Sequence, residues 1–355
     1  MAIQKTLNLN APLNANTSAT LKSTELVPEL AEASLTLHGD NYRQRQVRCN
    51  RFVFWHPISM TFFTASLVLY VCVQYRDYVS QADSIGEFFE FALDDRDFLF
   101  RLFMTLPGIV CLAACVSCVA YFLSDDFRTI SDKLPEHGYV NELYGFNLRN
   151  YAKLPEGGKN VTTSTEKELL KNGKNSSLLI YRDSPIAIAT VKPLLEKSDQ
   201  ENFFVSVTGL HIRKVFAKVD FDDLLLDWVN QRATELLGEY IKTNKKNKGA
   251  KVTILVEVFN FEKEFIKTLE SKFYSKVNVS YDLNTFPEIV AAENASHVKN
   301  RTKKSTRSVL KGVSIEAANK LFGLQKFTYA LTVSKKTVVE DIVPSTNDTP
   351  LKKRK

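Results

Sequence analysis

RFVFWHPISMTFFTASLVLYVCVQYR, residues 51–76, is the stretch of sequence that decides how this chain is organised. Between its terminal arginines, positions 52–75 carry no Asp, Glu, Lys or Arg, and LFMTLPGIVCLAACVSCVAYFL at 102–123 carries none either. A helix rises about 1.5 Å per residue and about 20 residues cross the hydrocarbon core of a bilayer, so each stretch is long enough to span it. The alternative, two core helices of a soluble protein, rarely gives charge-free stretches of this length. The sequence therefore predicts a transmembrane hairpin over residues 42–124, with spans at 52–75 and 102–123.

The charges around the two spans predict their orientation. The flank before the first span holds four arginines and no acidic residue: Arg43, Arg45, Arg48 and Arg51. The connecting segment, 76–101, holds seven acidic residues against three arginines. Because basic flanks stay on the cytosolic side, we expect a cytosolic N-terminus and a lumenal loop at 76–101. Two spans then return the C-terminal part to the cytosol.

The interior of the spans bears on function. His56, at the edge of the first span, is the only residue there of the kinds that carry charge near neutral pH. Proton relays and ion pathways in membranes are built from such residues, so the hairpin is not expected to transport anything itself. The second span instead carries small residues at helical spacing, which let another helix approach closely. We expect these residues to pack against helices of a client protein: Gly108, Cys111, Ala114, Cys115 and Cys118.

The cysteines do not indicate a metal site or a disulfide framework. A metal site formed by the three span cysteines is the less favoured alternative, and we expect no metal site. No cysteine follows position 118, which excludes a disulfide framework or a zinc–cysteine site in the C-terminal part.

The segments around the hairpin divide by composition. Residues 1–41 are rich in Asn, Ser, Thr, Ala and Leu and predict a disordered cytosolic tail, with a short helix at 24–37 as the exception. Residues 125–174 predict an irregular linker packed on the following domain.

Alternating and helical apolar patterns predict an α+β cytosolic domain over 175–335, with an insertion at 283–325. The expected strands are 177–182, 186–192, 203–210, 252–259, 276–281 and 327–333, and the expected helices are 220–242 and 261–273. This order of elements resembles the GCN5-related N-acetyltransferase fold. In that family, a glycine-containing turn before a helix lets backbone amides close on the pyrophosphate of acetyl-CoA.

The family's functional positions are degenerate here. The matching turn, RKVFAKV at 213–219, contains no glycine. Asn260 and Phe273 fit the family pattern, but Lys272 replaces a glycine. Thr268 lies near the position of the tyrosine that acts as the general acid and protonates the departing thiolate in that family. The resemblance therefore implies a non-catalytic relative with no cofactor and no catalytic residue. The competing hypothesis is a membrane-anchored, acetyl-CoA-dependent N-acetyltransferase.

Basic residues gather in three further places. Lys245, Lys246, Lys303 and Lys304 belong to two lysine-rich loops, which we interpret as solvated, with contact to anionic lipid as the functional alternative. Nucleic-acid binding is not expected, because no aromatic residues interleave these charges and the net charge of +7 is modest. Residues 336–355 predict a basic C-terminal tail. Its end, with Lys352 and Lys353, matches the Lys-Lys-x-x signal through which coat machinery retrieves proteins to the endoplasmic reticulum.

The whole chain resembles a fungal family of endoplasmic reticulum membrane proteins, the packaging chaperones for the high-affinity phosphate transporter. The resemblance rests on ELAEASLTLHGDNYR at 29–43, on the RFVFWHP that follows at 51–57, and on the hairpin and the basic tail. It implies a multi-pass membrane protein with both termini in the cytosol and a polytopic phosphate transporter as its client. Such a protein would help the transporter leave the endoplasmic reticulum and so support phosphate uptake.

Five acceptor sequons test the predicted orientation: Asn160, Asn175, Asn278, Asn294 and Asn300. A cytosolic domain never meets the lumenal glycosylation machinery, so we expect none of them to be modified. The measurement is the electrophoretic mobility of the full-length protein from cells, with and without endoglycosidase. A sequon cassette inserted into the 76–101 loop serves as the positive control, and a shift of the unaltered protein would reverse the orientation.

Overall fold

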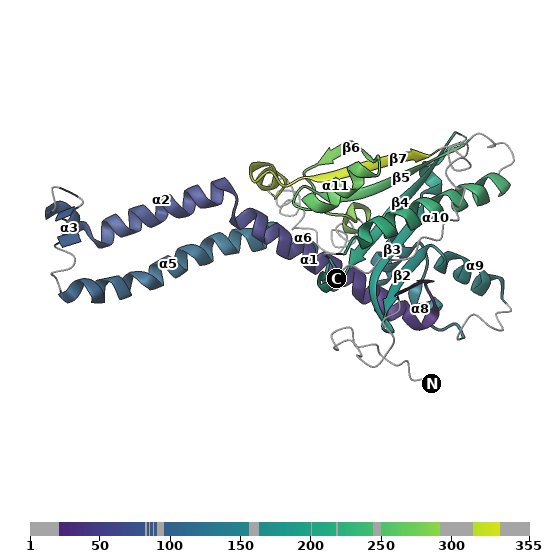
Figure 1. Ribbon diagram of the computed structural model, residues 1–355, viewed down its shortest axis with the longest axis horizontal. Coiled ribbons are helices and arrows are strands. Elements are labelled where there is room, and N and C mark those ends of the chain that lie inside the picture. Colours follow the sequence, from purple (N-terminus) through teal and green to yellow (C-terminus); the bar gives the residue numbers. More distant parts are fainter. Residues whose placement is uncertain are drawn as a thin grey trace, which may run out of the picture.

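Two long helices project together from a globular α+β domain in the computed structural model of the chain (Figure 1). The structure describes residues 21–81, 84, 86–87, 89–90, 96–155, 163–199, 201–217, 219–243, 250–291 and 315–333. The predicted combination of two apolar helices with an α+β domain is confirmed.

The domain is built on a seven-stranded mixed sheet with the strand order β1-β2-β3-β4-β5-β7-β6. The strands are β1 (Leu21–Glu25), β2 (Ser176–Tyr181), β3 (Ser184–Pro193), β4 (Asn202–Ile212), β5 (Lys251–Phe259), β6 (Ser275–Ser280) and β7 (Lys326–Val333). Neighbouring strands are antiparallel except for β4 and β5, which run parallel from Asn202↔Lys251 to Val207↔Val256. A parallel pair needs a crossover connection, and α10 (Phe221–Thr243) supplies it.

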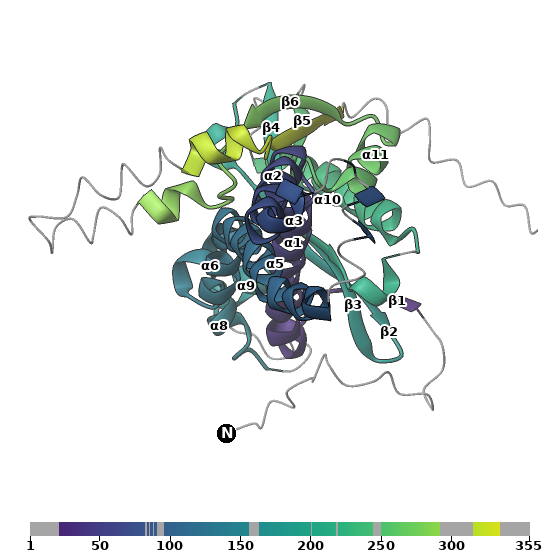
Figure 2. The same ribbon diagram turned by 90° about the vertical axis from the view of Figure 1, so that its left-hand side faces the viewer.

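Both faces of the sheet are buried against helices. In β2 and β3, Leu178 and Ile188 belong to one core, whereas Leu179 and Ala189 belong to the other. On the second side, α10 contributes its apolar stripe and α11 (Lys263–Ser271) adds Leu269. On the first side lie α1 (Ala31–Phe54), α6 (Asp125–Lys133), α7 (His137–Tyr144), α8 (Leu148–Tyr151) and α9 (Ser164–Gly173). Figure 2 shows α1 between α6 and β3, and α1 is in contact with α6, β3 and β4.

The predicted disorder of residues 1–41 is wrong for the part that the structure describes, since 21–25 form β1 and α1 begins at Ala31. Strand β1 pairs antiparallel with β2, and the short helix expected at 24–37 is replaced by this strand and by α1. The polar composition of α1 concealed its burial. Its polar side chains are satisfied by partners far away in the sequence: Ser34 shares a hydrogen bond with Tyr144 (2.8 Å), His38 with Thr190 (3.0 Å), and Asn41 donates to the Leu210 carbonyl (3.2 Å).

The expected boundary of the first span also needs correction. Residues 52–54 complete α1, and the span itself is α2 (Pro57–Gln74). Pro57 lacks an N–H and has the φ of a first helical residue, and the His56 ring accepts a hydrogen bond from the Ile58 amide (3.3 Å). The chain therefore changes direction at 55–56 instead of continuing one straight helix. The second span lies within α5 (Arg96–Leu123), and α3 (Arg76–Gln81) follows α2.

The segment 125–174 contains helices α6 to α9, so the prediction of an irregular linker there was wrong. Phe127, Leu143, Tyr144 and Tyr151 are buried in the core beside the sheet, as the expected packing on the domain requires. Its aromatic residues were too widely spaced to give a periodic signal. Of the 283–325 insertion, the described ends are packed on the same core through Leu283, Phe286, Phe322 and Leu324.

A buried ion pair fixes α1 to the start of α11. The Arg45 guanidinium donates to the Glu262 carboxylate over 3.2 Å, and the two side chains are only 10% and 4% exposed. Arg48 reaches the same carboxylate at 3.5 Å, and Glu262 also accepts from the Phe259 amide at 3.1 Å. Removing one member of such a pair leaves an uncompensated charge in the core.

We therefore expect Glu262→Gln to lower the free energy of unfolding of the domain by about 3 kcal/mol. The measurement is a urea titration of the full-length protein in detergent, with Trp55→Phe in every variant so that the fluorescence comes from Trp228 alone. Glu168→Gln, on the exposed face of α9, is the matched control and should change stability by less than about 0.5 kcal/mol. Equal losses in the two variants would contradict a structural role for the ion pair.

His38 provides a pH-dependent contribution to stability. Burial, together with the nearby Arg45, lowers the pKa of His38 to about 3. Between that value and the unfolded value near 6.5, the unfolded chain binds a proton that the folded chain does not, so lowering the pH favours unfolding. Burial also raises the pKa of Asp126 and Asp222 to about 6, which acts in the opposite direction.

The contribution of His38 is isolated by comparison with His38→Gln, because the carboxylates act equally in both proteins. From pH 7 to pH 5, we expect the unaltered protein to lose about 2 kcal/mol more unfolding free energy than the variant. Urea titrations at both pH values measure the difference. Parallel pH dependences would show that His38 is protonated in the folded state.

Candidate functional site at the membrane hairpin

The two spans pack against each other along one stripe of each helix. Gly108 of α5 faces the ring of Tyr70 on α2, and a Cβ at position 108 would collide with that ring. The hydroxyls of Tyr75 and Thr105 share a hydrogen bond of 3.1 Å, while Val116 and Ala120 are buried further along the same stripe. Small and medium side chains on this stripe let the two backbones run close together, as α2 and α5 do in Figure 1.

The residues predicted to meet a client helix do not all share one face. Gly108 belongs to the inner stripe, where it makes room for Tyr70. Cys111, Ala114, Cys115 and Cys118 are exposed on α5. Within the described part of the chain, no group of three His, Cys, Asp or Glu side chains is placed to hold a metal ion.

The outer surface of the hairpin is almost entirely apolar. Phe62, Leu69, Val73, Phe103 and Phe122 are each at least 60% exposed. Both Pro57–Gln74 and Phe100–Leu123 are long and apolar enough to cross a membrane. A continuous apolar surface of this size marks contact with lipid or with another protein.

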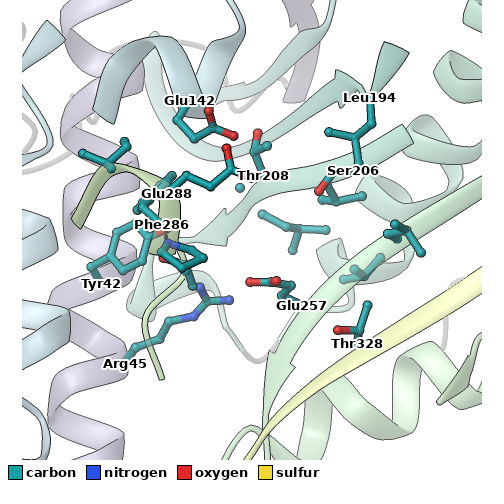
Figure 3. A pocket seen from close by; sticks show the side chains of 18 of the residues that line it. Tyr42, Arg45, Glu142, Leu194, Ser206, Thr208, Glu257, Phe286, Glu288 and Thr328 are labelled. Atoms are coloured by element: carbon teal, nitrogen blue, oxygen red, sulfur yellow. Dashed lines mark hydrogen bonds between the residues drawn. The ribbon is translucent and has the colours of Figure 1, made fainter. Parts of the chain in front are cut away.

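The domain has a cavity where β4 and β5 separate. Their pairing ends at Val207↔Val256, although β4 continues to Ile212 and β5 to Phe259. A cavity of about 210 Å³ lies beside this point, and Figure 3 shows Tyr42 and Arg45 of α1 entering it opposite Glu257. Burial raises the pKa of Glu257, against the attraction of Lys326 and Arg45.

The residues predicted to correspond to acetyltransferase motifs make structural contacts within the domain. The turn before α10 forms a short 3-10 helix (Lys214–Phe216) with Val215 81% exposed. The Asn260 side chain donates to the Gly323 carbonyl at 2.7 Å and accepts from the Gln325 amide at 3.3 Å, which ties β5 to β7. Lys272 forms an ion pair with Asp227 at 2.7 Å, and the Thr268 hydroxyl donates to the Glu264 carbonyl within α11.

The predicted basic sites lie outside the described residues: Lys245, Lys246, Lys303, Lys304, Lys352 and Lys353. Sequence reasoning in turn missed the junction between α1 and α2, where arginines and aromatic residues surround a groove. The arginines were visible in the sequence at 48 and 51. They were interpreted as orientation signals alone, because nothing in the sequence shows that α11 lies opposite them.

A comparison with family models identifies the chain. Residues 3–333 match the model described as inorganic phosphate transporter chaperone Pho86. The chain belongs to the Pho86 family. The expected family and function are thereby confirmed: this Pho86-family protein is a chaperone for a phosphate transporter and supports phosphate uptake. No curated protein matches the chain.

Proposed function

We propose that this Pho86-family chaperone resides in the endoplasmic reticulum membrane, contacts its client through the hairpin, and keeps the domain on the cytosolic side. The observation that carries the proposal is the hairpin surface, which is apolar all round and has one outward face of small side chains. Transporter helices that are not yet packed present the same kind of surface. Close packing between small residues favours such helix pairs in lipid, where the hydrophobic effect does not.

The fold supports the proposed topology. The segments on either side of the hairpin belong to one domain, since β1 pairs with β2 and α1 packs against α6. Both ends of the hairpin must therefore lie on the same side of the membrane. The arginines that precede α2 favour the cytosol for that side.

The domain is proposed to be a degenerate, non-catalytic relative of N-acetyltransferases. The mixed sheet, with one parallel pair joined through α10, supports the relation. The turn before α10 has no glycine to admit a pyrophosphate, and Tyr42 and Arg45 of α1 extend into the gap between β4 and β5. These features disfavour the acetyl-CoA-dependent enzyme and support a domain that shields client loops or holds the client during its export.

The C-terminal tail completes the proposal. Lys352 and Lys353 are proposed to return the chaperone to the endoplasmic reticulum through coat machinery, after the client has left. Lys245, Lys246, Lys303 and Lys304 are proposed to lie near anionic lipid in their loops.

The client surface is tested with two substitutions on α5. Cys115→Phe fills the small-residue face, whereas Val110→Phe adds the same side chain at an exposed site about 140° around the helix from Cys115. Forcing a larger side chain into a well-packed contact costs about 1–3 kcal/mol. We therefore expect Cys115→Phe to lower recovery of the phosphate transporter in mild-detergent co-purification about tenfold, and Val110→Phe to change it less than about twofold. Equal recovery with both variants would contradict a client surface at Cys115.

A further inference from the structure

A groove lies at the junction between the domain and the apolar hairpin. The C-terminal end of α1, the turn into α2 and the beginning of α11 enclose about 750 Å³. The lining residues are Arg48, Arg51, Phe52, Trp55, His56, Pro57, Phe261, Lys263 and Glu264.

The groove carries an excess of positive charge. Arg51 and Lys263 are exposed, and neither has an ion pair among the residues that the structure describes. Arg48 is half exposed and shares the Glu262 carboxylate, at 3.5 Å, with the closer Arg45. Among the lining residues, three cations accompany one carboxylate, that of Glu264, and Asp222 lies close enough to Arg48 to interact with it. The exposed Arg51 and Lys263 leave an excess of positive charge, so the groove favours an anion.

His56 adds a hydrogen-bond donor. Its Nδ1 accepts from the Ile58 amide at 3.3 Å, so the neutral ring carries its proton on Nε2. The ring is held between Phe52 and Phe322, at centroid distances of 5.9 Å and 5.6 Å. Beside it in the sequence, Trp55 is 66% exposed.

The position of the groove relative to the membrane selects its ligand. The apolar span begins at Pro57. Arg51 lies four residues before Trp55, where α1 ends, which is about 6 Å at about 1.5 Å per residue. The polar layer of a leaflet is roughly 5–8 Å thick. The long side chains of Arg51 and Lys263 therefore reach the depth of lipid phosphates, and Trp55 lies at the depth that tryptophan prefers.

We propose that this junction groove binds the headgroup phosphate of an anionic phospholipid from the leaflet through which the hairpin enters the membrane. Arg48, Arg51 and Lys263 contact the phosphate, the His56 Nε2–H donates to it, and Trp55 lies along the glycerol and the beginning of the acyl chains. A bound lipid would fix the angle between α1 and α2, and so the direction in which the hairpin leaves the domain. The inference rests on the proposed membrane insertion of the hairpin but not on the client surface.

Trp55 reports directly on the groove, because the chain has only 2 tryptophans and Trp228→Phe leaves Trp55 as the single one. The full-length Trp228→Phe protein in uncharged detergent is titrated with dioctanoyl phosphatidylserine, dioctanoyl phosphatidylcholine or inorganic phosphate. We expect a saturable change in Trp55 fluorescence with phosphatidylserine. The affinity for phosphatidylcholine should be lower by a factor of about ten or more. Inorganic phosphate at the same concentrations should leave the fluorescence unchanged.

The charge requirement is tested with Arg51→Gln combined with Lys263→Gln, which removes no ion pair among the residues that the structure describes and should leave the fold intact. We expect this double variant to bind phosphatidylserine about tenfold or more weakly than the parent. Lys167→Gln combined with Lys267→Gln, at exposed sites outside the groove, removes the same charge and should bind within about twofold of the parent. Equal weakening in both double variants, equal affinity for the two lipids, or saturation by inorganic phosphate alone would overturn the proposal.

Discussion

The buried contact of α1 with the sheet and with α11 is the constraint on which the rest of the structure depends. Arg45 meets Glu262 in the core, and His38 lies against Gly209 at a point where no Cβ would fit. The residues that precede the hairpin are thereby fixed to elements formed more than a hundred residues later. The apolar two-helix hairpin is consequently an insertion within one domain, between α1 and α6, and its two ends are fixed by the same core.

This arrangement explains how a chaperone can present the two candidate spans of its described residues in a defined direction. If a flexible linker joined the hairpin to the domain, contacts with the client and the lipid would determine the direction of the hairpin relative to the domain. Here α1 is buried along much of its length and turns into α2 at Pro57, while α5 passes into α6 through Ser124. Both helices of the hairpin therefore leave the domain from packed helices. The same arrangement delays completion of the domain, because β1 pairs with a strand that is synthesised only after both spans.

The chemistry of the chain agrees with a role in assembly. The spans place a glycine and a threonine hydroxyl where the helices of the hairpin touch, and they place sulfur and methyl groups on the outside. The domain uses its buried charges for structure: Arg45 and Glu262 join α1 to α11, and Arg232 is bound by Asn175 and Glu235. The side chains of Tyr42 and Arg45, both from α1, line the cavity at the point where the parallel pairing of β4 and β5 ends. Each of these groups stabilises an arrangement of helices and strands.

The sequence by itself determined the two spans, the sheet strands from 177 onward and the long helix α10, because charge-free length and apolar periodicity are local properties. It also showed that the spans carry no charged relay. Only the tertiary structure decided that residues 21–54 belong to the domain, since α1 is polar and its buried groups are satisfied by distant partners such as Thr190, Leu210 and Glu262. It likewise turned Gly108 inward toward Tyr70 and brought Lys263 opposite Arg51 at the membrane junction. The physical reason is the same in each case: which residues meet across long sequence separations depends on packing, and no local pattern records it.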